Sequence, residues 1–374
     1  MKQIKMVDLA AQHLRIHQEI HSALSNVIQD SVFINGPIVQ KFTSRFAQFL
    51  GVDYAIGCGN GTDALMVALM ALGLKSGDEV IVPSFNYVAA AEVIAVLGLT
   101  PVFADVDVHS FSINASEIDR LITNKTKAVI VVHLFGQCAE LEDIQAVCKS
   151  NNLFLVEDVA QSIGSEYTFS NGNVKMAGTI GDIGTTSFFP SKNLGCLGDG
   201  GAVFTSNPDL AKKLNMICNH GQSVKYHYEI VGVNSRLDSI QAAVLDVKLN
   251  YLSENLLARK NAAAIYNQLL SDTEVVIPFK AKQSTHTYNQ YTIQISGNRS
   301  KLQEYLSSFD IPSMVYYPVP LHKQKAYIPF AQSVNLPNSD YLSNCVLSLP
   351  IHPELELEQQ YFICEKLLVG LKLI

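Results

Sequence analysis

One lysine, Lys192, stands where an aromatic segment meets a glycine-rich turn, in the segment TTSFFPSKNLGCLGDGGAVFTS at residues 185–206. Burial beside a strand lowers the pKa of a lysine, and the neutral amine can then form an imine with a carbonyl carbon. The alternative, an ordinary lysine on a surface loop, is the commoner case for a single lysine. Lys192 is therefore a candidate nucleophile whose assignment depends on the residues around it.

Three further residues could hold a flat heterocyclic ring. Asp158 ends the apolar segment LFLVED, where a parallel sheet presents its ligands, and its carboxylate could keep a pyridine nitrogen protonated. An aspartate that only caps a helix explains the same position equally well. Gln161, one helical turn further on, could reach an oxygen on the ring. Tyr87, in PSFNYVAAAE, could stack on the ring face, although a lone tyrosine is more often part of a core.

A glycine-rich turn with Gly61 and Thr62, in GCGNGTDALMVAL, lies between a predicted strand and a predicted helix. Free backbone N–H groups and the helix dipole at such a place suit a phosphate, while a tight turn without a ligand is the alternative. The spacing G-x-G-x-G differs from the dinucleotide fingerprint G-x-G-x-x-G, and no acidic residue closes the next strand as that fingerprint requires. The chain also shows no H-E-x-x-H spacing, so we predict no metal site and disfavour a nicotinamide-dependent dehydrogenase.

Strand and helix patterns alternate along the chain, which predicts a mostly parallel sheet covered by helices. We expect strands at residues 54–57, 79–83, 100–104, 127–135, 153–158, 185–189 and 200–206. We expect helices at the N-terminus, from Pro37 onward, and at residues 62–72, 86–97, 115–122, 141–150, 253–270, 300–308 and from 356. A further strand is expected at 288–295. The fold class is thus α/β, with a large domain at residues 1–250 and a smaller C-terminal α+β domain at 251–374.

The composition is that of a globular protein. The 374 residues are 48% hydrophobic and 16% charged, with a formal net charge of -7 and no basic block, which argues against nucleic acid or an anionic membrane as partners. The first residues lack the apolar core of a signal peptide, and no apolar run reaches the length of a membrane span, so we expect a cytoplasmic protein. Seven scattered cysteines without a C-x-x-C pair indicate neither a disulfide framework nor a zinc cluster.

The candidate segments, in this order, resemble the DegT/DnrJ/EryC1/StrS family of nucleotide-sugar aminotransferases, which depend on pyridoxal 5'-phosphate (PLP) and have the aspartate aminotransferase fold (fold type I). The resemblance covers nearly the whole chain and rests on NGTDAL, GDEVIVPSFNYVA, VEDVAQSIG, SFFPSKNLGCLGDGGA, HGQ and VGVNSRLDSIQAA. It implies that Lys192 forms the Schiff base with PLP and is the catalytic acid–base. It also implies a ring contact by Tyr87, a ring-nitrogen contact by Asp158 and a ring-hydroxyl contact by Gln161.

The resemblance further implies that the glycine-rich turn with Gly61 and Thr62, together with Ser187, binds the cofactor phosphate. Asn234 is expected to reach the phosphate bound by a neighbouring subunit. We therefore expect a homodimer with two shared active sites.

Within the family, SFFPSKNLGCLGDGG and FGQCAE look most like the enzymes that aminate C3 of UDP-2-acetamido-2-deoxy-3-oxo-D-glucuronate, with L-glutamate as donor, for surface polysaccharides such as lipopolysaccharide O-antigen. The positions then expected to contact substrate are Phe33, Ser191, Arg236, Tyr316, Tyr317 and His322. Arg236 would suit the carboxylate of a uronate or of the donor. Two positions depart from that subgroup, since Tyr316 replaces a histidine and Phe33 a tyrosine; His322 or His220 could supply the lost hydrogen bonds.

Other functions on the same scaffold stay open. The sugar could be a dTDP-3-oxo-6-deoxyhexose or a UDP-4-keto sugar. PLP-dependent sugar dehydratases resemble this chain but lack the lysine at the position of Lys192. A non-catalytic PLP-binding regulator would not need an intact lysine, aspartate and phosphate turn.

Overall fold

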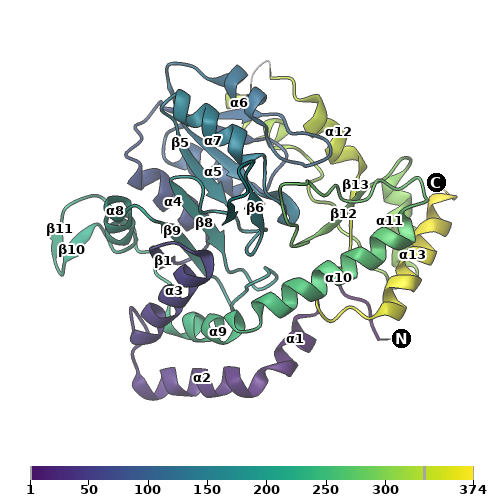
Figure 1. Ribbon diagram of the computed structural model, residues 1–374, viewed down its shortest axis with the longest axis horizontal. Coiled ribbons are helices and arrows are strands. Elements are labelled where there is room, and N and C mark those ends of the chain that lie inside the picture. The colour runs from purple at the N-terminus through teal and green to yellow at the C-terminus, as the bar shows by residue number, and fades with distance from the viewer. Residues whose placement is uncertain (1, 332–333, 374) are drawn as a thin grey trace.

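The computed structural model describes residues 2–331 and 334–373, and within them a seven-stranded sheet in the order β1-β9-β8-β5-β4-β2-β3 forms the centre of the molecule (Figure 1). Its strands are β1 (Tyr54–Cys58), β2 (Glu79–Pro83), β3 (Thr100–Ala104), β4 (Thr126–Val132), β5 (Phe154–Asp158), β8 (Ile183–Ser187) and β9 (Gly201–Thr205). The pairs β8-β5, β5-β4, β4-β2 and β2-β3 are parallel, whereas β9 runs antiparallel to both its neighbours. The predicted α/β sheet is confirmed, and so is the prediction that residues 185–206 continue it.

Strands β4 and β9 lie close to where they were expected because most of their residues are apolar, whereas β8 begins and ends two residues before the expected range 185–189. All five residues of β9 are buried, as are six of the seven in β4. The predicted strand at 127–135 is too long, since β4 ends at Val132 and Leu134–Gly136 form a 3-10 turn. Within this turn Phe135 has a φ of 58°, a left-handed conformation that a strand cannot contain.

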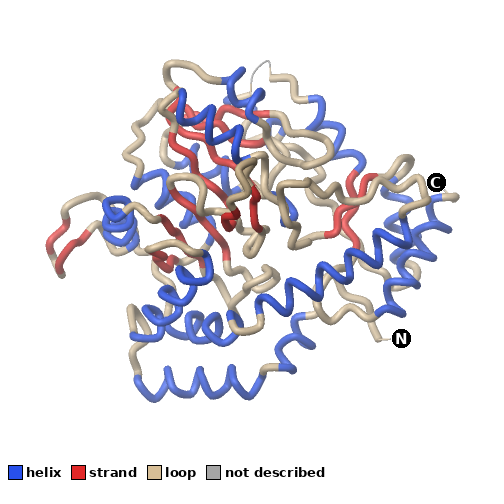
Figure 2. The backbone as a smooth tube through the Cα atoms, viewed as in Figure 1, coloured by secondary structure: helices blue, strands red, loops and turns tan. Residues whose placement is uncertain are grey.

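Helices cover both faces of the sheet, as the tube in Figure 2 shows. Their bounds are α1 (Leu9–Arg15), α2 (His17–Asp30), α3 (Pro37–Leu50), α4 (Gly61–Ala71), α5 (Ala89–Val96), α6 (Ala115–Leu121), α7 (Leu141–Ser150), α8 (Pro208–Cys218) and α9 (Ser239–Leu249). Local sequence explains the starts, because Pro37 stands at the first position of α3 and side chains of Asn60, Asn114 and Asp238 cap α4, α6 and α9. The predicted helix at 86–97 starts late, at Ala89, which leaves Tyr87 in a loop.

A cluster of phenylalanines fixes α3 to one face of the sheet. Phe42 and Phe46 on α3 are fully buried and pack with edge-to-face geometry against Phe188, with Phe204 beside Phe46. The opposite face holds a larger core that includes α4, α5 and the centres of β2 and β4. This double cover explains why the central strands show no alternation of polar residues.

The C-terminal part has a core of its own. Its elements are α10 (Leu252–Leu270), β12 (Tyr291–Gln294), α11 (Arg299–Ser307), α12 (Pro337–Cys345), β13 (Val346–Leu349) and α13 (Leu357–Leu371), with β12 and β13 antiparallel. The expected helices at 253–270, 300–308 and from 356 are confirmed within one residue at their starts, and the expected strand at 288–295 is shortened to β12. The domain boundary at residue 250 stays a prediction.

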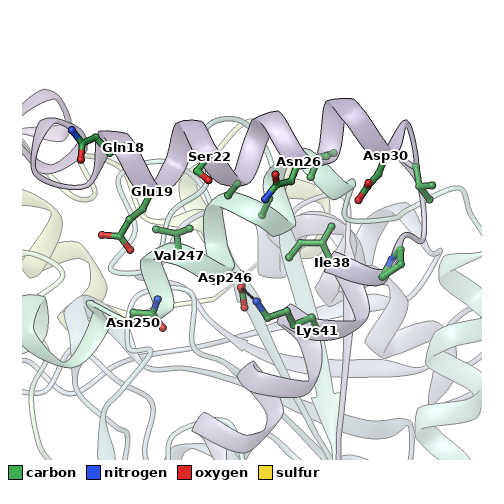
Figure 3. A pocket seen from close by; sticks show the side chains of 15 residues that line it. Gln18, Glu19, Ser22, Asn26, Asp30, Ile38, Lys41, Asp246, Val247 and Asn250 are labelled. Atoms are coloured by element: carbon green, nitrogen blue, oxygen red, sulfur yellow. Dashed lines mark ion pairs between the residues drawn. The ribbon is translucent and has the colours of Figure 1, made fainter.

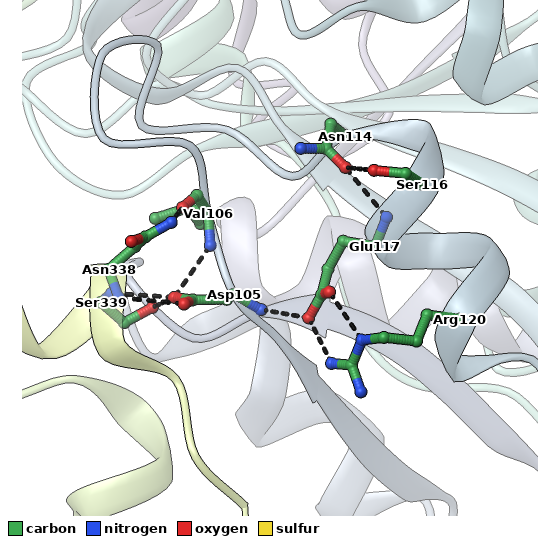
Figure 4. A network of polar contacts seen from close by, with 8 residues as sticks. All are labelled: Asp105, Val106, Asn114, Ser116, Glu117, Arg120, Asn338 and Ser339. Carbon is green, nitrogen blue, oxygen red and sulfur yellow. Dashed lines mark hydrogen bonds and ion pairs between the residues drawn. The ribbon is translucent and has the colours of Figure 1, made fainter.

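One polar network joins the end of β3 to α12 (Figure 4). The Asp105 carboxylate accepts hydrogen bonds from the backbone N–H groups of Asn338 and Ser339 and from the Ser339 hydroxyl, at 2.6–2.9 Å. Because Leu336, the residue before α12, gives no side-chain cap, Asp105 caps this helix from a distant part of the chain. The network positions α12 against the sheet.

Two short hairpins lie outside the main sheet. The hairpins are β6 (Glu166–Thr168) with β7 (Val174–Met176), and β10 (Gln222–Val224) with β11 (His227–Tyr228); the second projects from the molecule beside α8 (Figure 1). Neither hairpin was predicted, because each strand has only two or three residues. None of the helices in the described ranges could cross a membrane.

Candidate active site

The predicted site residues gather where β1, β2, β5 and β8 end, at the carboxyl edge of the sheet. Gly61 and Thr62 begin α4 just after β1, Tyr87 follows β2, and Asp158 and Ser187 are the last residues of β5 and β8. Parallel strands place their carboxyl ends at one edge, so the fold brings these distant segments together.

Lys192 lies on a tight turn that leaves β8 and folds back on itself. The turn is closed by a hydrogen bond from Lys192 N to Phe189 O of 2.9 Å and from Cys196 N to Phe188 O of 2.8 Å. A side chain at Gly195 would place its Cβ 2.4 Å from Pro190 O, so the closure requires glycine there. Lys192 is half-buried, and burial lowers its pKa, opposed by the negative charge of Asp158.

The pKa of Asp158 is raised, whereas that of Lys192 is lowered. Burial raises the pKa of Asp158, while a hydrogen bond from Ala160 N at 2.9 Å and the charge of Lys192 lower it. The opposite charges of Asp158 and Lys192 each shift the pKa of the other group, so the two side chains interact electrostatically in a partly desolvated region. A carboxylate with a raised pKa is stabilised in its charged form by a cationic ligand placed against it.

The start of α4 and the end of β8 form a narrow cradle. A Cβ built on Gly61 would lie 2.6 Å from Ser187 Cβ, so only glycine allows this approach. The Asn60 side chain accepts a hydrogen bond from Asp63 N, and the Asn60 carbonyl accepts one from Ala64 N. Among the described residues, the N–H groups of Gly61 and Thr62 have no protein acceptor. With the Ser187 hydroxyl alongside, these donors fit a phosphate at a helix N-terminus.

Gln161 and two tyrosines line the same edge. Gln161 is 6% exposed; its Oε1 accepts from Phe135 N at 2.9 Å and its Nε2 donates to the Tyr317 hydroxyl at 3.0 Å. The Tyr317 and Tyr87 rings lie 6.3 Å apart. Tyr87 is 57% exposed, which argues against the core position that a lone tyrosine usually takes. The Tyr87 ring is therefore accessible and could stack on a ligand.

The next predicted residues are Ser191 and Tyr316, which lie beside the site, and His322 and His220, whose environments differ. Ser191 and Tyr316 are half-buried, each adjacent in sequence to a site residue. His322 is 6% exposed and held by Ser84 Oγ at 2.7 Å, with Asp340 at 3.4 Å from its other nitrogen. Its Nδ1 thus has a close protein partner, whereas its Nε2 lies only at ion-pair distance from the Asp340 carboxylate. His220 is exposed and has a φ of 60°.

The remaining predicted residues lie around the start of α9. Arg236 is half-buried, Asn234 is exposed, and Phe33 is 43% exposed with its carbonyl accepting from Ser239 N at 2.8 Å. No hydrogen bond in the described ranges joins Phe33, Asn234 or Arg236 to Lys192. Their proposed contacts with substrate or with a partner's cofactor stay predictions.

Sequence reasoning missed a buried pair beside Asp158. His133 Nε2 lies 2.9 Å from Glu157 Oε2, and both side chains are 0% exposed. Since Ala139 N donates to His133 Nδ1 at 3.1 Å, the proton sits on Nε2 and is donated to Glu157. The available signal was a titratable residue next to apolar residues in each of two strand patterns, His133 after VV and Glu157 after LV.

A groove of about 590 Å³ lies elsewhere, between α2, α3 and α9 (Figure 3). Its lining includes Glu19, Asn26, Lys41 and Asp246, and Lys41 pairs with Asp246 at 2.8 Å. It contains none of the predicted site residues. The candidate site is therefore defined by its convergent side chains rather than by this groove.

Comparison with known proteins agrees with this geometry. The model of the DegT/DnrJ/EryC1/StrS aminotransferase family matches residues 14–368. The UDP-2-acetamido-2-deoxy-3-oxo-D-glucuronate aminotransferase of Pseudomonas aeruginosa is 40% identical over 97% of this chain and 99% of its own. The pleiotropic regulatory protein of Geobacillus stearothermophilus is 41% identical over 97% of each chain.

Solved structures show the same fold. DesV of S. venezuelae, in complex with a ketimine intermediate, superposes with a TM-score of 0.94 at 34% identity over 98% of both chains. NtdA from Bacillus subtilis, with bound cofactor PMP, gives a TM-score of 0.88 at 30% identity, over 95% of this chain and 82% of its own. The phosphate cradle at Gly61, Asp158 at the strand end and Lys192 on its turn fit such a cofactor. The chain belongs to the DegT/DnrJ/EryC1/StrS aminotransferase family, has the fold type I architecture of PLP-dependent transferases, and is a PLP-dependent sugar aminotransferase.

Proposed function

We propose that this aminotransferase moves the amino group of L-glutamate to C3 of UDP-2-acetamido-2-deoxy-3-oxo-D-glucuronate, in the cytoplasm, as a step toward a surface polysaccharide such as lipopolysaccharide O-antigen. The observation that carries the proposal is the placement of Lys192 and Asp158 in one partly desolvated region at the sheet edge. The substrate follows from the likeness, at 40% identity over nearly full length, to an enzyme named for that sugar.

Lys192 and Asp158 have separate roles in proton transfer. PLP, when bound, supplies the electron sink for the carbon from which a proton is removed. Lys192, whose pKa burial lowers, takes and returns that proton as a neutral amine. Asp158 holds the proton on the ring nitrogen, since a cationic N–H would stabilise its otherwise disfavoured charge.

The other residues bind and orient. Gly61, Thr62 and Ser187 hold the phosphate through two backbone N–H groups and one hydroxyl, Tyr87 covers the ring, and Gln161 offers its remaining amide hydrogen to the ring hydroxyl. We assign contacts with the sugar nucleotide or donor to Phe33, Ser191, Arg236, Tyr316, Tyr317 and His322. Asn234 reaches the site of a second subunit, so the active form is a homodimer with shared sites.

The test is an absorbance titration of the protein with PLP, then L-glutamate, then each candidate keto sugar nucleotide. We expect glutamate to remove the visible band of lysine-bound cofactor with release of 2-oxoglutarate, and the UDP-3-oxo-glucuronate nucleotide to restore it. Lys192→Ala should slow turnover by about 10²–10⁴-fold. The exposed Lys127, which donates to Asn124 O at 3.2 Å, provides a matched control as Lys127→Met.

Other outcomes identify other functions. Restoration only by a dTDP-3-oxo-6-deoxyhexose or a UDP-4-keto sugar would replace the substrate and keep the reaction. A sugar dehydratase would release a dehydrated sugar without consuming glutamate. A regulator, which the name of the Geobacillus relative suggests as the second candidate, would bind PLP and give no 2-oxoglutarate.

A further inference from the structure

We infer that Lys248, on α9, is a positioning residue that holds the turn carrying Lys192. Lys248 Nζ donates to Gly195 O at 2.7 Å and lies 3.0 Å from His13 Nε2 on α1. The inference rests on the proposed role of Lys192, and it identifies side chains of α9 that hold the turn on which Lys192 lies.

The bond to Gly195 acts at the base of the turn. Gly195 packs directly against Pro190, so residues 190–195 form a closed loop with Lys192 in its middle. The neighbouring Cys196 N is bonded to Phe188 O, which ties the same base to the end of β8. A donor that fixes the Gly195 carbonyl therefore limits how far the Lys192 backbone can move.

A second side chain of α9 holds the next part of the turn. Gln241 Oε1 accepts from Leu197 N at 2.9 Å. Gln241 and Lys248 are seven residues apart, which places them two turns apart on one face of the helix. The face of α9 that meets the turn thus offers an acceptor for Leu197 and a donor for Gly195.

Packing alone does not explain a lysine at this place. Lys248 is 5% exposed, and in the described part of the chain its Nζ meets a carbonyl and an imidazole but no carboxylate. Burying an ammonium with only neutral acceptors is costly, and a methionine would fill the volume without that cost. Burial lowers the pKa of Lys248 to about 8 and, together with the Lys248 charge, lowers that of His13, so His13 is a neutral acceptor at pH 7. The lysine is therefore explained by the carbonyl that it binds.

The test compares Lys248→Met with Lys127→Met in two measurements. In cofactor-free protein, hydrogen exchange of the amides of residues 193–198 should be at least about 10-fold faster in Lys248→Met and unchanged in the control. In the PLP-loaded enzyme, kcat should fall by about 10- to 100-fold, as a small misplacement of the reacting amine implies, while KM for the keto sugar changes less than about threefold. Lys248→Arg, which can still donate to Gly195 O, should recover most of both losses.

Wild-type exchange rates and wild-type kcat in Lys248→Met would overturn the inference. If Lys248→Met does not fold, Gln241→Ala is measured in its place, and unchanged exchange at residues 195–198 in that variant would overturn the inference as well. The proposed function is tested separately by reducing wild-type protein with borohydride in the presence of PLP. Failure to label Lys192 would refute its role whatever the exchange rates show.

Discussion

Gly61→Ala is the substitution with the sharpest expected effect on the cofactor site. The new Cβ would lie 2.6 Å from Ser187 Cβ and 3.2 Å from Ser187 Cα. Carbon atoms in contact prefer about 3.5–4.0 Å, so α4 and β8 must separate by about 1 Å. Overpacking of this kind costs about 1–3 kcal/mol, although a glycine-to-alanine change in a helix ordinarily stabilises by about 0.4–1 kcal/mol. The expected sign is therefore opposite to that of helix propensity.

The same movement would displace the N–H groups of Gly61 and Thr62 from the proposed phosphate site. A hydrogen bond to a charged group contributes about 1.5–3 kcal/mol, so the loss of one predicts PLP binding weaker by about 10- to 100-fold. The measurements are urea unfolding without PLP and an absorbance titration with PLP.

Ser187→Gly distinguishes a steric cause from a general loss of stability. It deletes the atom that the new methyl group meets, so the double variant Gly61→Ala/Ser187→Gly should be more stable than the sum of the single effects predicts. Strictly additive losses, or wild-type PLP affinity in Gly61→Ala, would refute the steric cradle.

Three further predictions follow from the polar contacts. Asp105→Asn replaces an acceptor of three hydrogen bonds at the start of α12 and should lower the unfolding free energy by about 1–3 kcal/mol in urea denaturation. The pKa of Lys248 is about 8 in the folded protein and 10.5 in the unfolded chain, so between these pH values the unfolded chain binds one proton more than the folded protein. The free energy of unfolding of the wild type should therefore rise by about 3 kcal/mol from pH 8 to 10.5 relative to that of Lys248→Met. The measurement is urea unfolding of both proteins across this pH range. Glu157→Gln should cost about 3 kcal/mol or more in stability, whereas Asp158→Asn should leave thermal unfolding nearly unchanged and slow transamination by about 10²-fold or more.

The sheet could be predicted from the sequence because its signals are local. Apolar strands, asparagine caps and Pro37 all act within a few residues, and the helix at Leu141–Ser150 was expected with the bounds that it has. The end of β4 could not be predicted, because the left-handed Phe135 depends on contacts with distant residues: its N–H donates to Gln161 and its carbonyl accepts from Asn289 N. Tertiary contacts decide such boundaries, and a single sequence does not contain them.

The residues of the candidate site also fall into those that the sequence pattern indicates and those that it does not. Lys192, Asp158 and the glycine-rich turn at Gly61 could be proposed from the sequence because each ends or follows a strand pattern. Lys248 and His133 could not, because only the tertiary structure shows the groups that they contact. A lysine on an amphipathic helix is usually solvent-exposed, and nothing local shows that Lys248 faces the carbonyl of a residue more than fifty positions away.

Glu157 and Asp158 show why structure is needed to separate two adjacent carboxylates. Successive side chains of a strand point to opposite faces, so the two lie in different environments. Burial opposes the charge of both. On Glu157 it is outweighed by His133 and by the N–H groups of three residues in the loop before β8, so the pKa is lowered.

Asp158 receives one backbone N–H, from Ala160, and its pKa is raised. The satisfied carboxylate holds a loop in place and has no capacity left for a ligand. The other faces the site with acceptor capacity to spare, and the cation that satisfies it must come from outside the strand. Two adjacent acidic residues therefore differ in the number of donors that the fold brings to each, and this difference supports the proposed ligand-binding role of Asp158 but not one for Glu157.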